Sequence, residues 1–335
     1  MNRPLPIAGD FELAANAAWP ACAAPAVSVV VSLFNYAAYI EECLASVAAT
    51  KTENLPGGFE IIIVDDASTD SSAQLVEKFL TATTLPVCLV KKNPNTGVAD
   101  TRNLGLQLAR ASFIFILDAD NTIRPDCLAA HHHALETSGS AMVYGHINRF
   151  DHATRRSLGT MSDRDWSVPE LAARPYIDAM AMFRKDALLR VGGYSPELPG
   201  WQDYDLCLKL AQAGLAGKMI PQVLSDYRVH TSSMNQTSRQ FQRELALYFS
   251  KKFFNLVPLA AGELLFGTPR NELALATGKN FFPHQPPSRA ARFIQRLLGE
   301  KLSRSLRRRI IALYAWLHPL SPLPVIGDKN EETAN

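Results

Sequence analysis

The stretch FIFILDADNT, residues 113–122, places two carboxylates directly after a run of apolar, β-prone residues. A continuous apolar run of this length is typical of a strand that is buried on both faces of a sheet. Asp118 and Asp120 follow it and flank a single alanine. Solubility does not require a pair of acids at the end of a buried strand, so we interpret Asp118 and Asp120 as candidate site residues.

Strands and helices alternate on the N-terminal side of this stretch. Apolar runs predict strands, and apolar residues spaced three or four apart predict helices. The predicted strands are 27–33, 59–66, 85–91 and 112–117, and the predicted helices between them are 39–49, 71–80 and 98–110. Such alternation is typical of an α/β fold with a doubly wound, mostly parallel sheet.

Ligands of such sheets bind outside the carboxyl ends of the strands. Several polar or aromatic residues fall at those ends in this chain, namely Ser32, Phe34, Asn35, Asp65, Asp66, Asp118 and Asp120. The sequence therefore predicts one acid-rich crevice that three strands form together.

The chain lacks the glycine motifs with which many α/β domains bind nucleotides. Neither G-x-G-x-x-G after the first strand nor G-x-x-x-x-G-K-[ST] is present, and the first strand ends in SLFNY instead. A phosphorylated ligand in an acid-rich crevice needs its charge screened. Oxygen ligands suit Mg²⁺ or Mn²⁺, so a divalent cation is the expected cofactor.

The regular alternation weakens after residue 125, where short apolar runs such as 141–147 and 179–183 indicate mixed or antiparallel strands. Residues 204–214 are expected to form a helix that ends at Gly214. We expect a loose leader over residues 1–25, a catalytic domain over 26–237 and a mainly helical extension over 238–335. The catalytic domain divides into a nucleotide-sugar half, 26–125, and an acceptor half, 126–237.

Composition excludes several classes of protein. The formal net charge of the 335 residues is only +2, which does not indicate a nucleic-acid binder. Five isolated cysteines form no disulfide or zinc pattern and suggest a reducing compartment. No apolar run reaches the roughly 18–20 residues of a membrane span, and no signal peptide is recognisable. We expect a cytoplasmic protein.

Positive charge is concentrated in the C-terminal part. Residues 289–309 contain eight Lys or Arg and the single acid Glu300. Apolar residues recur among them with helical spacing, so residues 289–311 are predicted to be a basic amphipathic helix. Such a helix either packs on the catalytic domain or lies on an anionic membrane, and the sequence leaves both interpretations open.

Two further D-x-D pairs occur, Asp163/Asp165 and Asp203/Asp205. The first lies in the polar segment SDRDWS, which is typical of a solvated loop. The second opens a predicted helix, where an aspartate is often an N-cap. Only Asp118/Asp120 follows a buried strand.

Residues 26–234 resemble the family 2 glycosyltransferases, which have the GT-A fold and invert the anomeric configuration. The segments that carry the resemblance are VSVVVSLFNYAAYIEECLASV, EIIIVDDASTDSS, NTGVADTRNLGLQLARASFIFILDADN, FRKDALLRVGGYSPEL, WQDYDLCLKLAQAG and YRVHTSSM. Several motifs in the right order are a more specific signal than one D-x-D. The resemblance implies a GT-A-type nucleotide-diphospho-sugar transferase fold.

The resemblance also implies roles for individual residues. Ser32, Asn35, Asp66 and Asp118 would bind the nucleotide-sugar donor, and Asp120 and His230 would hold the cation. We count Phe34 and Arg102 among the candidate donor-binding residues as well, and the sequence leaves open whether Arg102 is instead a salt-bridge partner. Asp203 would be the catalytic base, because the incoming hydroxyl must lose its proton. The family usually has Glu-Asp at this point, whereas this chain has Gln202-Asp203.

The implied function is transfer of a sugar from a nucleotide diphosphate sugar to a saccharide or lipid-linked acceptor, in surface polysaccharide or glycolipid synthesis. Two alternatives remain at this point. One is a nucleotidyltransferase that makes nucleotide sugars, although SLFNY does not supply the glycine-rich basic loop it would need. The other is a non-catalytic scaffold that binds sugar nucleotides, for which Gln202 is the only indication.

Overall fold

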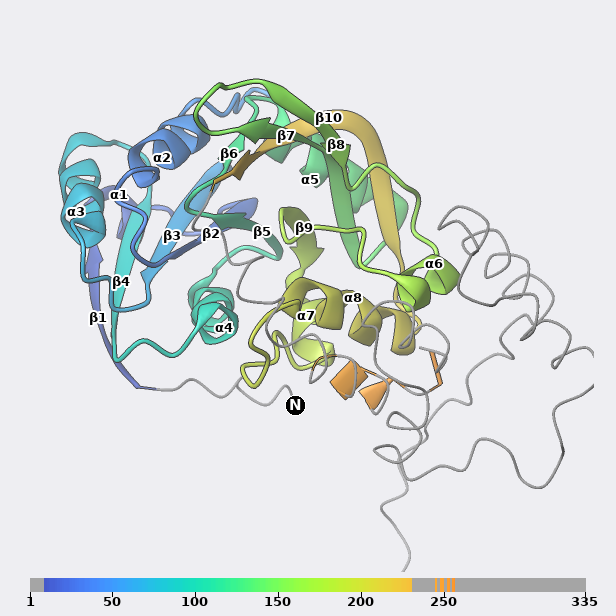
Figure 1. The fold of residues 1–335 in the computed structure, drawn as a ribbon. Coiled ribbons are helices and arrows are strands. Elements are labelled where there is room, and N and C mark those ends of the chain that lie inside the picture. Colours follow the sequence, from blue (N-terminus) through green and yellow to red (C-terminus); the bar gives the residue numbers. More distant parts are fainter. Residues whose placement is uncertain (1–8, 231–244, 246–247, 250–251, 254, 257–335) are drawn as a thin grey trace, which may run out of the picture. The chain divides into compact units, whose positions relative to one another are not determined.

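The computed structural model describes residues 9–230, 245, 248–249, 252–253 and 255–256, which contain one mixed sheet with helices on both faces (Figure 1). The strands are β1 Asp10–Ala15, β2 Val27–Leu33, β3 Phe59–Asp65, β4 Val87–Asn93, β5 Phe113–Asp118, β6 Thr122–Ile123, β7 Met142–Asp151, β8 Ser157–Met161, β9 Ala181–Arg184 and β10 Gly217–Val229. The helices are α1 Ala18–Ala21, α2 Ile40–Ala48, α3 Ser72–Ala82, α4 Val98–Leu108, α5 Cys127–Ser138, α6 Val168–Ala173, α7 Lys185–Arg190 and α8 Gln202–Gln212.

The order of strands in the sheet is β1-β4-β3-β2-β5-β9-β7-β10-β6, and β8 pairs with β7. Strands β4, β3, β2 and β5 are parallel to one another, as the alternation of strands and helices predicts. Strand β9 is antiparallel to both β5 and β7. The mixed second half of the sheet is therefore also as expected.

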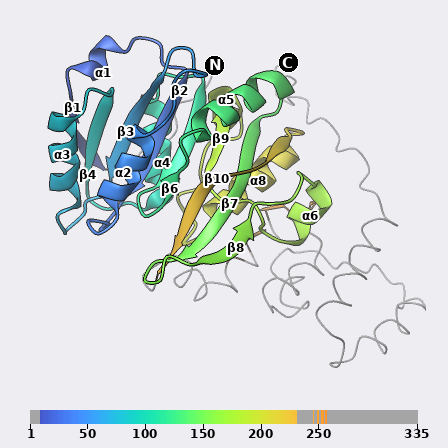
Figure 2. The same ribbon diagram turned by 90° about the horizontal axis from the view of Figure 1, so that it is seen from above.

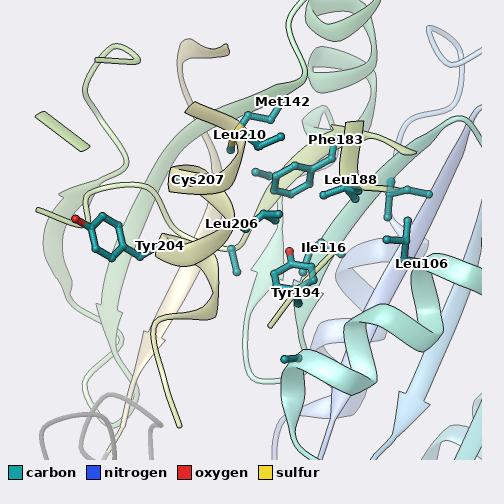
Figure 3. Close-up of a cluster of buried hydrophobic side chains, with 14 of the residues drawn as sticks. Leu106, Ile116, Met142, Phe183, Leu188, Tyr194, Tyr204, Leu206, Cys207 and Leu210 are labelled. Atoms are coloured by element: carbon teal, nitrogen blue, oxygen red, sulfur yellow. The ribbon is translucent and has the colours of Figure 1, made fainter. Parts of the chain in front are cut away.

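The side chains of the sheet divide into two cores. One core lies between the sheet and helices α2, α3 and α5, which lie together on one side of the sheet (Figure 2). The other core contains residues of α4, α7 and α8. Figure 3 shows part of it, with Leu106, Ile116, Phe183, Leu188, Tyr194 and Leu206 in mutual packing. Every residue of β2 and β3 is buried, which explains why both strands are mostly apolar.

Helix α4 lies unusually close to β2 because it carries Gly105. A Cβ atom added at Gly105 would come within 2.3 Å of Val30 Cγ1, which no side chain could tolerate. The close approach buries every residue from Ala99 to Leu106, including Arg102. A glycine in this helix therefore brings a charged side chain to the sheet.

The expectation of a loose leader over residues 1–25 is wrong for residues 10–21. Strand β1 pairs antiparallel with β4, from Asp10 opposite Asn93 to Ala15 opposite Cys88, and α1 follows. The strand lies at the edge of the sheet, and most of its residues are exposed. The exposed fraction is 43% for Phe11 and 50% for Leu13. The segment DFEL does alternate polar and apolar residues, but only over four residues, which is a weak signal for a strand.

The core also continues past the predicted domain boundary at residue 237. Leu245, Phe249, Phe253 and Leu256 are buried in the core that contains α8. The basic segment 289–311 lies outside the described residues, as does most of the predicted extension. All five cysteines are free thiols, as expected. Among the described residues, no helix has the length and hydrophobicity to cross a membrane.

Candidate active site

The carboxyl ends of β2, β3 and β5 meet at one edge of the sheet, as the sequence predicts. Ser32 lies directly opposite Asp118 in the parallel ladder of β2 and β5, and Leu33 lies opposite Asp65 in the ladder of β2 and β3. The register alone therefore brings a hydroxyl and two carboxylates together.

Asp118 is held by two donors from different elements. The Ser32 hydroxyl and the Arg102 guanidinium each donate to Asp118 Oδ1 at 2.7 Å. The Arg102 side chain is 6% exposed and the Asp118 side chain 27%, so the ion pair opens toward solvent on the aspartate side. Arg102 also stacks over the Tyr194 ring, 5.2 Å from its centroid. The orientation of Asp118 is thus fixed by the chain itself.

Asp120 meets His230 across the sheet edge. Asp120 Oδ2 and His230 Nε2 are 2.9 Å apart, and both side chains are buried. The antiparallel pairing of β6 with β10 makes this contact, because it carries the chain after β10 back past the Asp120 loop. The His230 ring packs against Tyr36 and Tyr39, with centroid distances of 5.9 and 4.9 Å. Burial raises the pKa of Asp120, and the hydrogen bond from His230 opposes that rise.

This pair fits a divalent cation that uses few protein ligands. The described residues contain no group of three or more His, Cys, Asp or Glu side chains placed to hold a metal ion. Mg²⁺ bound with a nucleotide commonly takes one or two carboxylates and completes its shell with phosphate oxygens and water. A carboxylate and an imidazole in contact at a ligand-binding edge agree with that pattern. We therefore find the donor set compatible with the expected Mn²⁺ or Mg²⁺.

Asp66 lies in a buried polar network that the sequence does not predict. Its carboxylate accepts hydrogen bonds from the backbone N–H groups of Thr96 at 3.0 Å and Gly97 at 2.7 Å. Lys92 Nζ lies 3.0 Å from Asp66 Oδ1 and 2.6 Å from Asp100 Oδ2, and all three side chains are at most 4% exposed. Asp66 thus fixes the loop before α4. Its predicted contact with the donor remains a prediction.

Asn35 orders the loop that follows β3. Its backbone has a left-handed conformation with φ of 54°, which asparagine tolerates better than most residues. Its side-chain Oδ1 accepts hydrogen bonds from the backbone N–H of Thr69 at 2.8 Å and of Asp70 at 3.3 Å. Phe34 beside it is 42% exposed. An exposed ring next to a fixed loop is available to a planar ligand.

Asp203 lies in the first turn of α8 and is half-buried. Among the described residues, no other side chain donates a hydrogen bond to it. Burial raises the pKa of Asp203, and the positive charge of Arg102 offsets part of that rise. Arg102 therefore lies within electrostatic reach of both Asp118 and Asp203, so the structure brings the predicted base to the predicted donor residues.

Gln202 has a hydrogen bond that glutamate could not make when ionised. The residue is 6% exposed, and its Nε2 donates to the Leu198 carbonyl oxygen at 2.9 Å. Trp201 before it has φ of 59°, a strained conformation for a large residue. The amide of Gln202 thus holds the loop that leads into the turn of Asp203.

The structure adds Asp178, which sequence analysis missed. Burial and then the negative charge of Asp203 raise the pKa of Asp178 to about 7. Asp178 Oδ1 accepts a hydrogen bond from the Met180 N–H at 3.0 Å, just before β9. Because β9 is antiparallel to β5, its beginning lies beside the end of β5. No local motif marks Asp178, and only this strand pairing could have identified it.

Tyr227 of β10 is a second residue that sequence analysis missed. Burial raises its pKa, and the negative charges of Asp178, Asp120, Asp118 and Asp203 raise it further. All four acids therefore lie within electrostatic reach of the Tyr227 phenol. The segment YRVH marks its neighbourhood in the sequence but does not indicate which of its side chains face the acids.

The two other D-x-D pairs have different surroundings. Asp163 and Asp165 are exposed, as the sequence predicts. Asp205 is fully buried and ion-paired with Lys209 at 3.2 Å and Lys252 at 2.9 Å. Lys252 connects α8 to the described C-terminal residues, so Asp205 stabilises the fold rather than serving the crevice.

Known structures share this fold. The first 349 residues of TarS from S. aureus, solved with UDP-GlcNAc, superpose with a TM-score of 0.56 at 19% identity, covering 74% of this chain and 75% of that chain. The mannosyltransferase PcManGT from Pyrobaculum calidifontis was solved with GDP-Man and Mn²⁺. It superposes with a TM-score of 0.58 at 20% identity, covering 94% of this chain and 84% of that chain. The fold is that of a GT-A type glycosyltransferase.

The sequence comparison defines the family. The family profile described as "Glycosyl transferase family 2" matches residues 28–192, from β2 to just beyond α7. Residues 28–192 therefore match the family that the resemblance implies, the family 2 glycosyltransferases. Similar proteins include the glycosyltransferase GlyG of Streptococcus pneumoniae serotype 4, 26% identical over 46% of this chain and 50% of GlyG. The chondroitin synthase of Pasteurella multocida is 27% identical over 57% of this chain and 19% of the synthase.

A third relative is the succinoglycan biosynthesis protein ExoO of Rhizobium meliloti, 28% identical over 48% of this chain and 44% of ExoO. The chain thus spans half or less of the length of these three relatives. The names of two of them, the chondroitin synthase and ExoO, refer to the synthesis of polysaccharides.

Proposed function

We propose that this protein is a metal-dependent, inverting glycosyltransferase that moves a sugar from a nucleotide diphosphate sugar to an acceptor hydroxyl. The observation that carries the proposal is the buried contact of Asp120 with His230, together with the half-buried Asp203, which lies within electrostatic reach of Arg102 and Asp118. A cation ligand pair and a free carboxylate are the two functions that such a transfer requires.

The donor would lie over the carboxyl ends of β2, β3 and β5. Phe34, Asn35 and Asp66 would face the nucleoside, and Ser32, Arg102 and Asp118 would meet the ribose and the diphosphate. Asp118 is fixed by Ser32 and Arg102 before any ligand arrives, which lowers the entropic cost of binding. UDP-GlcNAc and GDP-Man, which the two structural neighbours bind, indicate the class of donor.

Asp203 would act as the general base. The acceptor oxygen forms a bond to the anomeric carbon, the bond from that carbon to the diphosphate oxygen breaks, and the acceptor proton moves to Asp203. One displacement by a nucleophile in line with the leaving group inverts the anomeric centre. Because burial raises the pKa of Asp203, its carboxylate accepts the proton more readily than an exposed aspartate would.

Asp120 and His230 would hold the cation against the diphosphate, where a bound Mn²⁺ or Mg²⁺ stabilises the charge of the leaving group. The acceptor would be a saccharide or a lipid-linked saccharide in surface polysaccharide or glycolipid synthesis. The names of ExoO and the chondroitin synthase support this setting.

Hydrolysis of the donor in the absence of acceptor tests the proposal. The protein is incubated with a panel of UDP- and GDP-sugars and Mn²⁺, and the products are separated. We expect a nucleoside diphosphate and a free sugar whose anomeric configuration, followed by NMR before mutarotation, is inverted. Exchange between a nucleoside triphosphate and pyrophosphate would instead indicate a nucleotidyltransferase. Donor binding without any turnover would indicate a non-catalytic scaffold.

We also propose that the basic segment 289–311 brings the enzyme to anionic membrane surfaces. Its support is the excess of Lys and Arg over acids. Deletion of residues 288–335 should weaken sedimentation with anionic liposomes and leave donor hydrolysis largely intact. Equal sedimentation of the shortened and full chains would contradict this role.

A further inference from the structure

Arg228 is the largest fully buried side chain among the described residues and carries a positive charge. It lies on β10, two residues before His230. A buried guanidinium is costly unless its donors find partners, and those of Arg228 do. Its contacts reach three separate parts of the chain, so its position requires an explanation beyond filling the core.

The first partner of Arg228 is the loop that carries Asp120. Arg228 Nε donates to the Asp120 carbonyl oxygen at 2.8 Å, and the Arg228 backbone N–H donates to Asn121 Oδ1 at 2.9 Å. These two bonds fix the peptide plane after Asp120. The direction of that plane sets where the Asp120 side chain points, and it points to His230 Nε2.

The second partner is helix α2. Arg228 Nη2 donates to Glu42 Oε2 at 2.7 Å, and the guanidinium lies over the ring of Tyr39, 5.1 Å from its centroid. The Tyr39 ring in turn packs on His230 at 4.9 Å. One guanidinium thus supports Asp120 directly and His230 through Tyr39.

The third partner is the turn between β7 and β8. Arg228 Nη1 lies 3.2 Å from His152 Nδ1, and the guanidinium also covers the Phe150 ring at 4.9 Å. Glu42 accepts a second ion pair from Arg155 of the same turn at 2.6 Å. The turn and α2 therefore hold the Arg228 side chain from both sides.

We infer that Arg228 is a positioning residue for the Asp120–His230 cation site, an inference that rests on the proposed function. Only a planar fork of donors satisfies a carbonyl, a carboxylate and an imidazole at once, which lysine cannot do. Residues that orient metal ligands typically change metal affinity 10- to 100-fold when they are replaced. Arg228 does not touch the reacting atoms, and its effect passes through Asp120 and His230.

The test compares Arg228→Lys with Arg110→Lys in the full chain. Arg110 likewise pairs with a buried carboxylate, that of Glu60, and stacks on an aromatic ring, that of Trp19. Glu60 lies near the start of β3, at the other end of the strand from the site. Calorimetric titration with Mn²⁺ in the presence of UDP or GDP should give about 10- to 100-fold weaker affinity for Arg228→Lys and an unchanged affinity for Arg110→Lys.

The ring ¹⁵N resonances of His230, assigned by comparison with His230→Gln, provide a readout that needs neither metal nor turnover. They should shift in Arg228→Lys and stay in place in Arg110→Lys. If the wild type binds no Mn²⁺, the metal dependence of the proposed function fails, and the resonances alone then decide the inference.

If Arg228→Lys does not fold, Glu42→Gln replaces it in the test. We expect Glu42→Gln to fold, because the Glu42 side chain is 44% exposed and the change is small. It should weaken Mn²⁺ binding several-fold and shift the His230 resonances. The inference is overturned if a folded Arg228→Lys variant has the His230 resonances and the Mn²⁺ affinity of the wild type. If Arg228→Lys is unfolded, the same result in Glu42→Gln overturns it.

Discussion

The two halves of the catalytic domain each contain a pair of buried or half-buried acids, and the two pairs differ in how their charge is compensated. The first pair is Asp66 with Asp100, and the second is Asp178 with Asp203. Asp66 and Asp100 share the ammonium of Lys92, and two backbone N–H groups also donate to Asp66. Asp178 and Asp203 have no ion pair among the described residues, and burial raises the pKa of both.

The difference separates two uses of a carboxylate. An acid whose charge the chain itself compensates can fix a loop, as Asp66 does before α4. An acid that is buried without such compensation has a raised pKa and can accept a proton during a reaction. This contrast between Asp66 with Asp100 and Asp178 with Asp203 agrees with the proposed roles, donor binding in the first half of the domain and proton transfer in the second.

The largest expected effect is on the rate of transfer in Asp203→Asn. The amide keeps the size of the side chain but cannot accept the proton, so the turnover number should fall by about 10² to 10⁴. Donor affinity should change little, because Asp203 would face the acceptor. Initial rates and donor titrations measure the two effects separately.

Asp163→Asn is the matched control, because Asp163 begins another D-x-D pair and is exposed. Its transfer rate should equal that of the wild type. Near-normal transfer by Asp203→Asn would remove Asp203 from the mechanism.

Lys92→Met should cause the largest loss of stability. It leaves the carboxylates of Asp66 and Asp100 buried without their cation, and a broken buried pair typically costs about 3–5 kcal/mol in free energy of unfolding. Chemical denaturation measures the loss. The neighbouring Lys91 pairs with Glu77 at the surface, so Lys91→Met should cost less than about 1 kcal/mol. Equal losses of stability in the two variants would mean that burial of Lys92 with Asp66 and Asp100 does not increase their contribution to stability.

Asp178→Asn should raise the free energy of unfolding, whereas Lys92→Met lowers it. The folded-state pKa of Asp178 is about 7, above the ordinary value near 3.9, so the wild type loses stability as pH rises from about 4 to about 7. Removal of the carboxyl group should raise the free energy of unfolding at pH 8 by about 1–3 kcal/mol and change it little at pH 4. Thermal unfolding at both pH values measures this. A variant that is less stable than the wild type at pH 8 would show that Asp178 has a compensating partner.

The smallest effect is expected for Gln202→Glu, which restores the usual family residue. The glutamate would lose the hydrogen bond to the Leu198 carbonyl oxygen, at a cost of about 1–2 kcal/mol in stability. Donor affinity should not change. A marked gain in transfer rate without loss of stability would instead mean that the negative charge missing from this position limits catalysis.

Sequence analysis predicted the first half of the domain closely, because its strands are buried on both faces and read as continuous apolar runs. Strand β2 has the predicted bounds 27–33, and the register of β2 with β5 places Ser32 beside Asp118. Strand β10 was missed, because Pro221 interrupts it at a register shift and its exposure follows no regular pattern.

The candidate site was predictable only where its residues belong to a recognised motif or the end of a buried strand. Asp178 and Lys92 carry no such mark, and the segment YRVHTSSM contains Arg228 without indicating what it contacts. Their roles depend on contacts between segments that are distant in sequence, such as those of Asp120 and Arg228, which are 108 positions apart. Partners of this kind become visible only when the sheet has been assembled.

The most direct test of the central claim is calorimetric titration of the wild type, Asp120→Ala and Asp203→Asn with UDP and with GDP, in the presence and absence of Mn²⁺. The account predicts that the wild type binds at least one nucleotide only with Mn²⁺, that Asp120→Ala loses this binding, and that Asp203→Asn keeps it. Nucleotide affinity that survives unchanged in Asp120→Ala, or that is lost in a folded Asp203→Asn, would contradict the division into a donor-holding half and a proton-accepting half.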